Sequence, residues 1–144
     1  GIREGIYRYV PANNRSQLVQ HGPYQVWMDA YNANPSSMKA SVANAFRLRR
    51  DKVVLILGDM LELGEEAEAI HAEMGRFVSG FQPQMTVGIG PLMQHALAEI
   101  DGPTAGFPDL ASAANEIAGL VRGAELILLK GSRGIALEGL LAHF

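Results

Sequence analysis

The 144-residue sequence contains no cysteine, which excludes a disulfide framework and a thiolate metal site. Its four histidines are scattered without close ligand spacing, so we expect no metal site in the chain. No apolar run approaches the ~18 residues of a membrane helix, and no signal-peptide-like start is present, so we expect a soluble, cytoplasmic protein without membrane insertion. A net charge of -3 offers no broad attraction for nucleic acid.

What the sequence does contain is enough apolar material for one ordinary domain. Hydrophobic residues make up 48% of the chain, which is sufficient for a full core. Short apolar runs alternate with amphipathic segments, as strands alternate with helices in α/β proteins. We expect a helix or helix tail over 2–10, a hairpin over 15–28, strands at 53–57, 85–89, 104–107 and 125–130, and helices at 36–49, 65–80, 92–100, 110–121 and from about 134 to 144.

The apolar run at 53–57 is continuous, which is typical of a strand buried on both faces and therefore of a parallel sheet. The hairpin adds one antiparallel edge strand. Helices between buried strands imply right-handed crossovers on both faces of the sheet. The predicted fold is therefore α/β, a Rossmann-like three-layer domain whose sheet is mostly parallel with one antiparallel edge strand.

Polar residues gather where three of the predicted strands end, at 29–34, 58–62 and 130–133. If these strands are parallel, the three segments converge on one edge of the sheet, where open α/β sheets bind ligands. Structural roles remain open for each segment. The first two have the composition of turns and helix N-caps, and the third resembles an anion-holding turn but lacks the spacing of a P-loop.

Two other features favour structural roles. His71 lies within a predicted helix, where a histidine is more often exposed or packed than a catalytic base. The Gly88-Ile89-Gly90 segment lacks the third glycine and the later acid of a dinucleotide-binding motif, which argues against NAD.

Four separated motifs, taken together, resemble the C-terminal domain of the Mur ligase family. They are NNRS at 13–16, DAYNANP at 29–35 followed by SM at 37–38, GDMLELG at 58–64 with His71 and Gly75, and KGSR at 130–133. Enzymes of this family have a UDP-sugar-binding domain, a central ATPase with a GTxGKT-like P-loop, and a Rossmann-like third domain. Nothing here matches the first two. The resemblance implies that residues 1–14 are the tail of the central ATPase domain and a linker, and that residues 15–144 are the third domain.

The resemblance also implies an activity. Such enzymes are ATP-dependent amide-bond-forming ligases of peptidoglycan precursor synthesis, and so of cell wall biogenesis, cell shape and cell division. ATP with Mg²⁺, bound mainly by the central domain, would phosphorylate a peptide carboxylate, and an amine would attack the acyl phosphate. The motifs at 31–34 and 130–133 favour D-alanyl-D-alanine and UDP-N-acetylmuramoyl-tripeptide as substrates over those of a sister ligase that adds a single amino acid or glutamate. Without a P-loop, this fragment alone is not expected to be active.

For the nucleotide, the resemblance implies five contacts. Arg15 would be catalytic, because its forked, permanently charged guanidinium would reach the ATP phosphates. Asp29 would hydrogen-bond the nucleotide ribose. Tyr31, Asn32 and Asn34 would lie beside the nucleotide, with Asn34 also near the amine substrate.

For the dipeptide, the resemblance implies that its carboxylate is held by Lys130, Ser132 and Arg133, a role that suits a charged turn at a helix start. Asp59 and Glu62 would orient the incoming ammonium. The third domain would contribute by closing onto the ATPase and excluding water from the acyl phosphate.

A different class of function is also compatible with these residues. A free-standing Rossmann-like module that binds a small molecule or a nucleotide would use the same strand-end groups as ligand contacts. A P-loop domain encoded before Gly1 in the same reading frame would distinguish the ligase from such a module.

Overall fold

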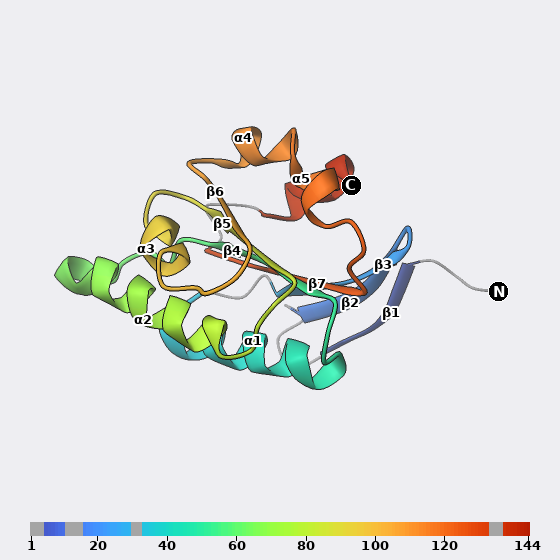
Figure 1. Ribbon diagram of the computed structural model, residues 1–144. Helices are drawn as coiled ribbons and strands as arrows, with labels where there is room; N and C mark the ends of the chain where they lie inside the picture. Colours follow the sequence, from blue (N-terminus) through green and yellow to red (C-terminus); the bar gives the residue numbers. More distant parts are fainter. Residues whose placement is uncertain (1–4, 11–15, 30–32, 133–136) are drawn as a thin grey trace.

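The computed structural model describes residues 5–10, 16–29, 33–132 and 137–144 (Figure 1). Its centre is a seven-stranded sheet with the order β1-β2-β3-β7-β4-β5-β6. The strands are β1 (Gly5–Val10), β2 (Ser16–His21), β3 (Tyr24–Asp29), β4 (Val53–Gly58), β5 (Met85–Ile89), β6 (Thr104–Phe107) and β7 (Leu126–Lys130). The helices are α1 (Pro35–Leu48), η1 (Gly64–Glu66), α2 (Ala67–Ser79), α3 (Met93–Leu97), α4 (Leu110–Ala114), α5 (Ile117–Leu120) and η2 (Leu137–His143).

The sheet is parallel from β3 to β6, through the pairs β3·β7, β7·β4, β4·β5 and β5·β6. β2 pairs antiparallel with both β1 and β3, so among the described strands it alone runs against the others. The predicted mostly parallel sheet with one antiparallel strand is thus confirmed. That strand is not outermost, however, because β1 pairs along its free side.

β1 lies where we expected a helix or helix tail, and that expectation was wrong. The segment GIYRYV is rich in β-branched and aromatic residues, which favour strands. It pairs with β2, which would otherwise be an open edge of the sheet. The assignment of residues 1–14 to another domain stays a prediction.

Helices cover both faces of the sheet, which gives the predicted three layers (Figure 1). α1, α2 and α3 pack on one face around a cluster that includes Leu55 and Leu128, while α4, α5 and η2 pack on the other around Ile56 and Ile127. Every residue of β4 and β7 is buried. The two central strands therefore hold the sheet in place, and their ends are fixed points for a site.

The helices after β5 are shorter than expected. The segment predicted at 92–100 is helical only over Met93–Leu97. The one predicted at 110–121 divides into α4 and α5, and the last helix is a 3₁₀ helix. Buried Ala113, Ile117 and Val121 recur every four residues through the division, so apolar spacing could not reveal it.

Candidate functional site

The strand ends at which the three polar segments begin lie side by side at one edge of the sheet. In the strand register Asp29 pairs with Lys130, and Lys130 pairs with Leu57, one residue before the end of β4. β3, β7 and β4 are parallel neighbours, so their carboxyl ends face the same way. We call this region, with Asp29, Asp59, Lys130 and Ser132, the carboxyl edge. It is where a doubly wound sheet binds ligands.

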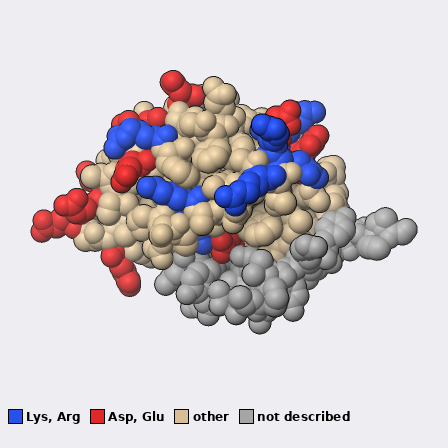
Figure 2. Space-filling view, turned by 90° about the horizontal axis from the view of Figure 1, so that it is seen from below, with Lys and Arg blue, Asp and Glu red and all other residues tan. Residues whose placement is uncertain are grey.

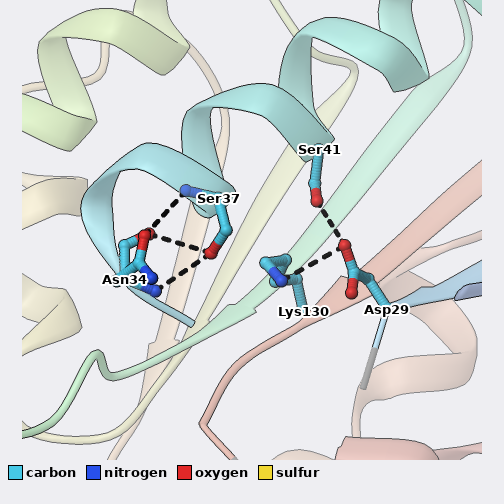
Figure 3. A network of polar contacts seen from close by, with 5 residues as sticks. All are labelled: Asp29, Asn34, Ser37, Ser41 and Lys130. Carbon is cyan, nitrogen blue, oxygen red and sulfur yellow. Dashed lines mark hydrogen bonds and ion pairs between the residues drawn. The ribbon is translucent and has the colours of Figure 1, made fainter. Parts of the chain in front are cut away.

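A buried ion pair joins the first two strands of the carboxyl edge (Figure 3). Lys130 Nζ lies 3.1 Å from Asp29 Oδ2, and the side chains are 0% and 11% exposed. Ser41 Oγ, from the second turn of α1, donates to the same oxygen at 2.5 Å. A buried ammonium is costly without a partner, so the pair fixes both side chains. Sequence reasoning missed Ser41, although it is a polar residue within the buried stripe of α1.

The turn after β7 packs tightly against the end of β4. A Cβ added at Gly131 would lie 3.0 Å from the Gly58 Cα, so there is little space for a side chain. Ser132 follows, 8% exposed, and its Oγ has no hydrogen-bond partner among the described residues. Buried hydroxyls usually have a partner. An unpartnered one at the carboxyl edge is a group that a ligand could satisfy.

Asn34 is the N-cap of α1. Its Oδ1 accepts from the Ser37 backbone N–H at 2.8 Å, and its own N–H donates to Ser37 Oγ at 3.1 Å (Figure 3). Pro35 occupies the first turn, where its missing N–H costs nothing. The capping interpretation of Asn34 is therefore correct, and its contact with a ligand stays a prediction.

Asp59 also caps a helix, but one that begins more than thirty residues later. Its carboxylate accepts from the backbone N–H groups of Leu92 at 3.1 Å and Met93 at 2.8 Å, at the start of α3. Gly90, at φ +118°, passes so close that a Cβ there would lie 2.5 Å from the carboxylate. Both oxygens of Asp59 thus serve the fold. Glu62 is exposed with φ +62° in the loop after β4, and the ammonium-orienting role of either acid stays a prediction.

His71 is fully buried and holds the same loop. The Met60 backbone N–H donates to its Nε2 at 3.0 Å, so Nδ1 carries the proton and donates to the Ala67 carbonyl at 2.7 Å. His71 is therefore packed and hydrogen-bonded within the fold, one of the two structural roles expected for it. Together, His71 and Asp59 attach the 58–64 loop to α2 and α3.

Four predicted site residues, Arg15, Tyr31, Asn32 and Arg133, lie outside the described residues. Within the described part of the chain, no group of three or more histidine or acidic side chains is placed to hold a metal ion. None of the helices seen there is long and apolar enough to cross a membrane.

The face formed by α1 and α2 carries charges of both signs (Figure 2). Lys39 pairs with Glu73 at 3.6 Å, and Arg76 pairs with Glu99 at 3.3 Å. These exposed pairs contribute little to stability. The interspersed charges do not form a field of one sign that would attract a polyanion to this face.

The architecture and the carboxyl edge define a class of protein, a Rossmann-like α/β domain with a polar ligand edge beyond its central parallel strands. The family model described as "Mur ligase, glutamate ligase domain" matches residues 14–133. The chain therefore belongs to the Mur ligase family.

Relatives support this assignment. The UDP-N-acetylmuramoyl-tripeptide--D-alanyl-D-alanine ligase of Escherichia coli (strain K12) is 33% identical over 95% of this chain and 30% of its own length. A crystal structure of MurF from Acinetobacter baumannii aligns with a TM-score of 0.81 and 28% identity, over 92% of this chain and 30% of that one. MurF ligase from Thermotoga maritima, solved with ADP, has the same fold at a TM-score of 0.75 and 23% identity, over 95% of this chain and 31% of that one. The chain thus spans about 30% of these relatives.

Proposed function

We propose that this chain is the third domain of an ATP-dependent ligase that joins D-alanyl-D-alanine to UDP-N-acetylmuramoyl-tripeptide in peptidoglycan precursor synthesis. The observation that carries the proposal is that the family match and the strand ends with the predicted motifs fall in the same part of the chain. The family match spans residues 14–133, and within it the strand ends that hold the motifs at 29–35, 58–64 and 130–133 form one carboxyl edge. The relative from Escherichia coli, 33% identical, bears the name of this activity.

In the proposed reaction, the tripeptide carboxylate attacks the γ-phosphorus of ATP and forms an acyl phosphate and ADP. The amine of D-alanyl-D-alanine then attacks the acyl carbon, and phosphate leaves as the amide forms. Because ATP is the proposed donor, we place the reaction in the cytoplasm. The phosphates and Mg²⁺ would be held mainly by a central ATPase domain.

The carboxyl edge fits a supporting role in that reaction. Asp29 offers a carboxylate acceptor for a ribose hydroxyl, and the unpartnered Ser132 hydroxyl offers a donor to a ligand carboxylate. Arg15, Tyr31, Asn32, Asn34 and Arg133 are assigned to the nucleotide and the dipeptide by their motifs alone. Closure of this domain would bring these groups to the acyl phosphate and exclude water.

The test begins with the coding region upstream of Gly1, which should encode a GTxGKT-type loop. The full-length protein should then release phosphate from ATP only when both the tripeptide substrate and D-alanyl-D-alanine are present. Glutamate or a single alanine in place of the dipeptide should not support turnover. Asp29→Ala and Arg15→Ala should slow turnover or weaken ATP use, whereas Glu116→Gln, at the exposed position before α5, should not.

An initiation codon at or near residue 1 would remove the phosphate chemistry and leave a free-standing binding module. Turnover with a single amino acid in place of the dipeptide would reassign the protein to a sister ligase. Unchanged steady-state kinetics in both alanine variants would overturn the roles proposed for those residues.

A further inference from the structure

We propose that Lys130 is a positioning residue for Asp29, and that it does not itself bind the dipeptide carboxylate as its motif suggested. Lys130, Asp29 and Ser41 would form a unit, here called the Asp29 clamp, that sets the carboxylate presented to the nucleotide ribose. This inference rests on the proposed function and assigns Lys130 to the nucleotide rather than to the amine substrate.

The Lys130 side chain is 0% exposed, although it lies at the end of a strand whose edge faces a proposed ligand. A carboxylate arriving from outside would find no surface of the ammonium to contact. It could reach Nζ only if the lysine left its present position.

Within the described part of the chain, Asp29 is the acidic group that lies within 4 Å of Lys130 Nζ, at 3.1 Å. The charge of the ammonium is therefore already balanced by one carboxylate at ion-pair distance, while its Nζ has no hydrogen-bond partner among the described residues. Binding a second anion there would either separate the pair or bury a net negative charge, and both are costly in a site of low dielectric.

Lys130 Nζ and Ser41 Oγ approach the same carboxylate oxygen from different elements, β7 and α1 (Figure 3). Asp29 is the more exposed partner of the pair, at 11% against 0%. The lysine therefore contacts Asp29 from the buried side, and the Asp29 carboxylate is the group at the surface of the site. Binding sites become more precise when buried partners hold a ligand-contacting residue in one orientation.

The backbone supports the same assignment. Asp29 and Lys130 are directly paired in register, and Lys130 is paired on its other side with Leu57 of β4. All residues of β7 are buried. The lysine therefore belongs to one of the two fully buried strands. This position suits a residue that orients a neighbouring side chain better than one that must move to meet an incoming substrate.

The test measures KM for ATP and for D-alanyl-D-alanine separately in the full-length protein. Lys130→Met should raise KM for ATP about tenfold, as expected for loss of a charge-assisted contact that orients Asp29. KM for the dipeptide should stay within about twofold of wild type. Titration calorimetry with ADP should show the same loss of affinity. A general loss of packing would instead weaken the binding of the dipeptide as well as that of the nucleotide.

Ser41 supplies an independent variant, because the clamp predicts that both partners of Asp29 act on the same substrate. Ser41→Ala should raise KM for ATP about threefold, as expected for loss of one hydrogen bond. Ser41→Thr, which keeps a hydroxyl, should restore it. Ser36→Ala, on the exposed face of the same helix, is the matched control and should behave as wild type. If Lys130→Met does not fold, the Ser41 variants still test whether the partners of Asp29 act on ATP binding.

A rise in KM for the dipeptide with unchanged KM for ATP would overturn the proposal and return Lys130 to the dipeptide carboxylate. Reduced kcat with both KM values unchanged would overturn it in favour of a purely structural lysine. Absence of ATP-dependent ligation in the wild-type protein would instead reject the proposed function itself.

Discussion

The buried pair between Asp29 and Lys130 predicts an unequal effect of removing its two partners. Asp29→Asn leaves the Lys130 ammonium, 0% exposed, without its carboxylate. Removing one partner of a buried pair typically costs about 3–5 kcal/mol. Lys130→Met should cost less, about 1–3 kcal/mol, because Asp29 is 11% exposed and keeps the hydrogen bond from Ser41.

The double variant should be more stable than Asp29→Asn alone, because it removes the unpaired ammonium. The coupling free energy between the two changes must then exceed the loss in Lys130→Met alone, so we expect about 3 kcal/mol. With a urea m-value of about 2 kcal/mol per molar, Asp29→Asn should lower the unfolding midpoint by about 2 M. Trp27, the only tryptophan, lies on β3 two residues before Asp29 and reports unfolding by its fluorescence.

Exposed Asp51→Asn is the control for loss of an acid and should change the free energy of unfolding by less than about 0.5 kcal/mol. Two results would refute the reasoning. One is a double variant whose loss equals the sum of the single losses, since the pair would then have no coupling. The other is a greater loss in Lys130→Met than in Asp29→Asn, since the buried ammonium would then not be the costly group.

Three further predictions concern helix packing, a buried histidine and a helix N-cap. Gly75→Ala places a Cβ 2.0 Å from the Ala96 carbonyl oxygen, so α2 and α3 must separate, and urea unfolding should show a loss of about 3 kcal/mol. Gly119→Ala, with open space around it, should lose nothing, and equal losses would contradict the packing argument. His71→Ala should cost about 3 kcal/mol and speed hydrogen exchange at the Met60 amide, whereas exposed His143→Ala should do neither. The Ser112 backbone N–H donates to the Asp109 carboxylate and lowers the pKa of that carboxyl from its ordinary value of 3.8. The stability that this hydrogen bond contributes is present above the ordinary pKa and is lost as the pH falls through the lowered pKa of the folded protein. An NMR titration that gives a pKa of 3.8 or higher for Asp109 would contradict this prediction.

Features that depend on local pattern could be predicted from the sequence. The continuous apolar run at 53–57 indicated a strand buried on both faces, and all of β4 is buried in a parallel sheet. Asn34 before Pro35 indicated a helix start, and both lie where α1 begins. Parallel pairing then placed the polar strand ends at one edge, because the direction of the strands decides which ends meet.

Features that depend on distant contacts could not be predicted. Asp59 caps α3 through Leu92 and Met93, and nothing in its neighbouring sequence indicates which helix it serves. His71 accepts from the Met60 N–H eleven residues earlier, across the turn between β4 and α2. The burial of Lys130 was also missed, because a lysine at a strand end is normally solvated. In each case the partner is chosen by tertiary packing.

The charges of the carboxyl edge have a consequence for the proposed ligase. Lys130 is matched by Asp29, and the Asp59 carboxylate is matched by the N-terminal amides of α3, so the described side chains leave little net positive charge there. A triphosphate and an acyl phosphate need cationic groups near them as charge develops on the transferring phosphoryl group. Those cations would have to come from Arg15 and Arg133, which lie outside the described residues, and from a central ATPase domain with its Mg²⁺. In the proposed ligase, the edge described here would orient a ribose and a dipeptide, and domain closure would be required for every turnover.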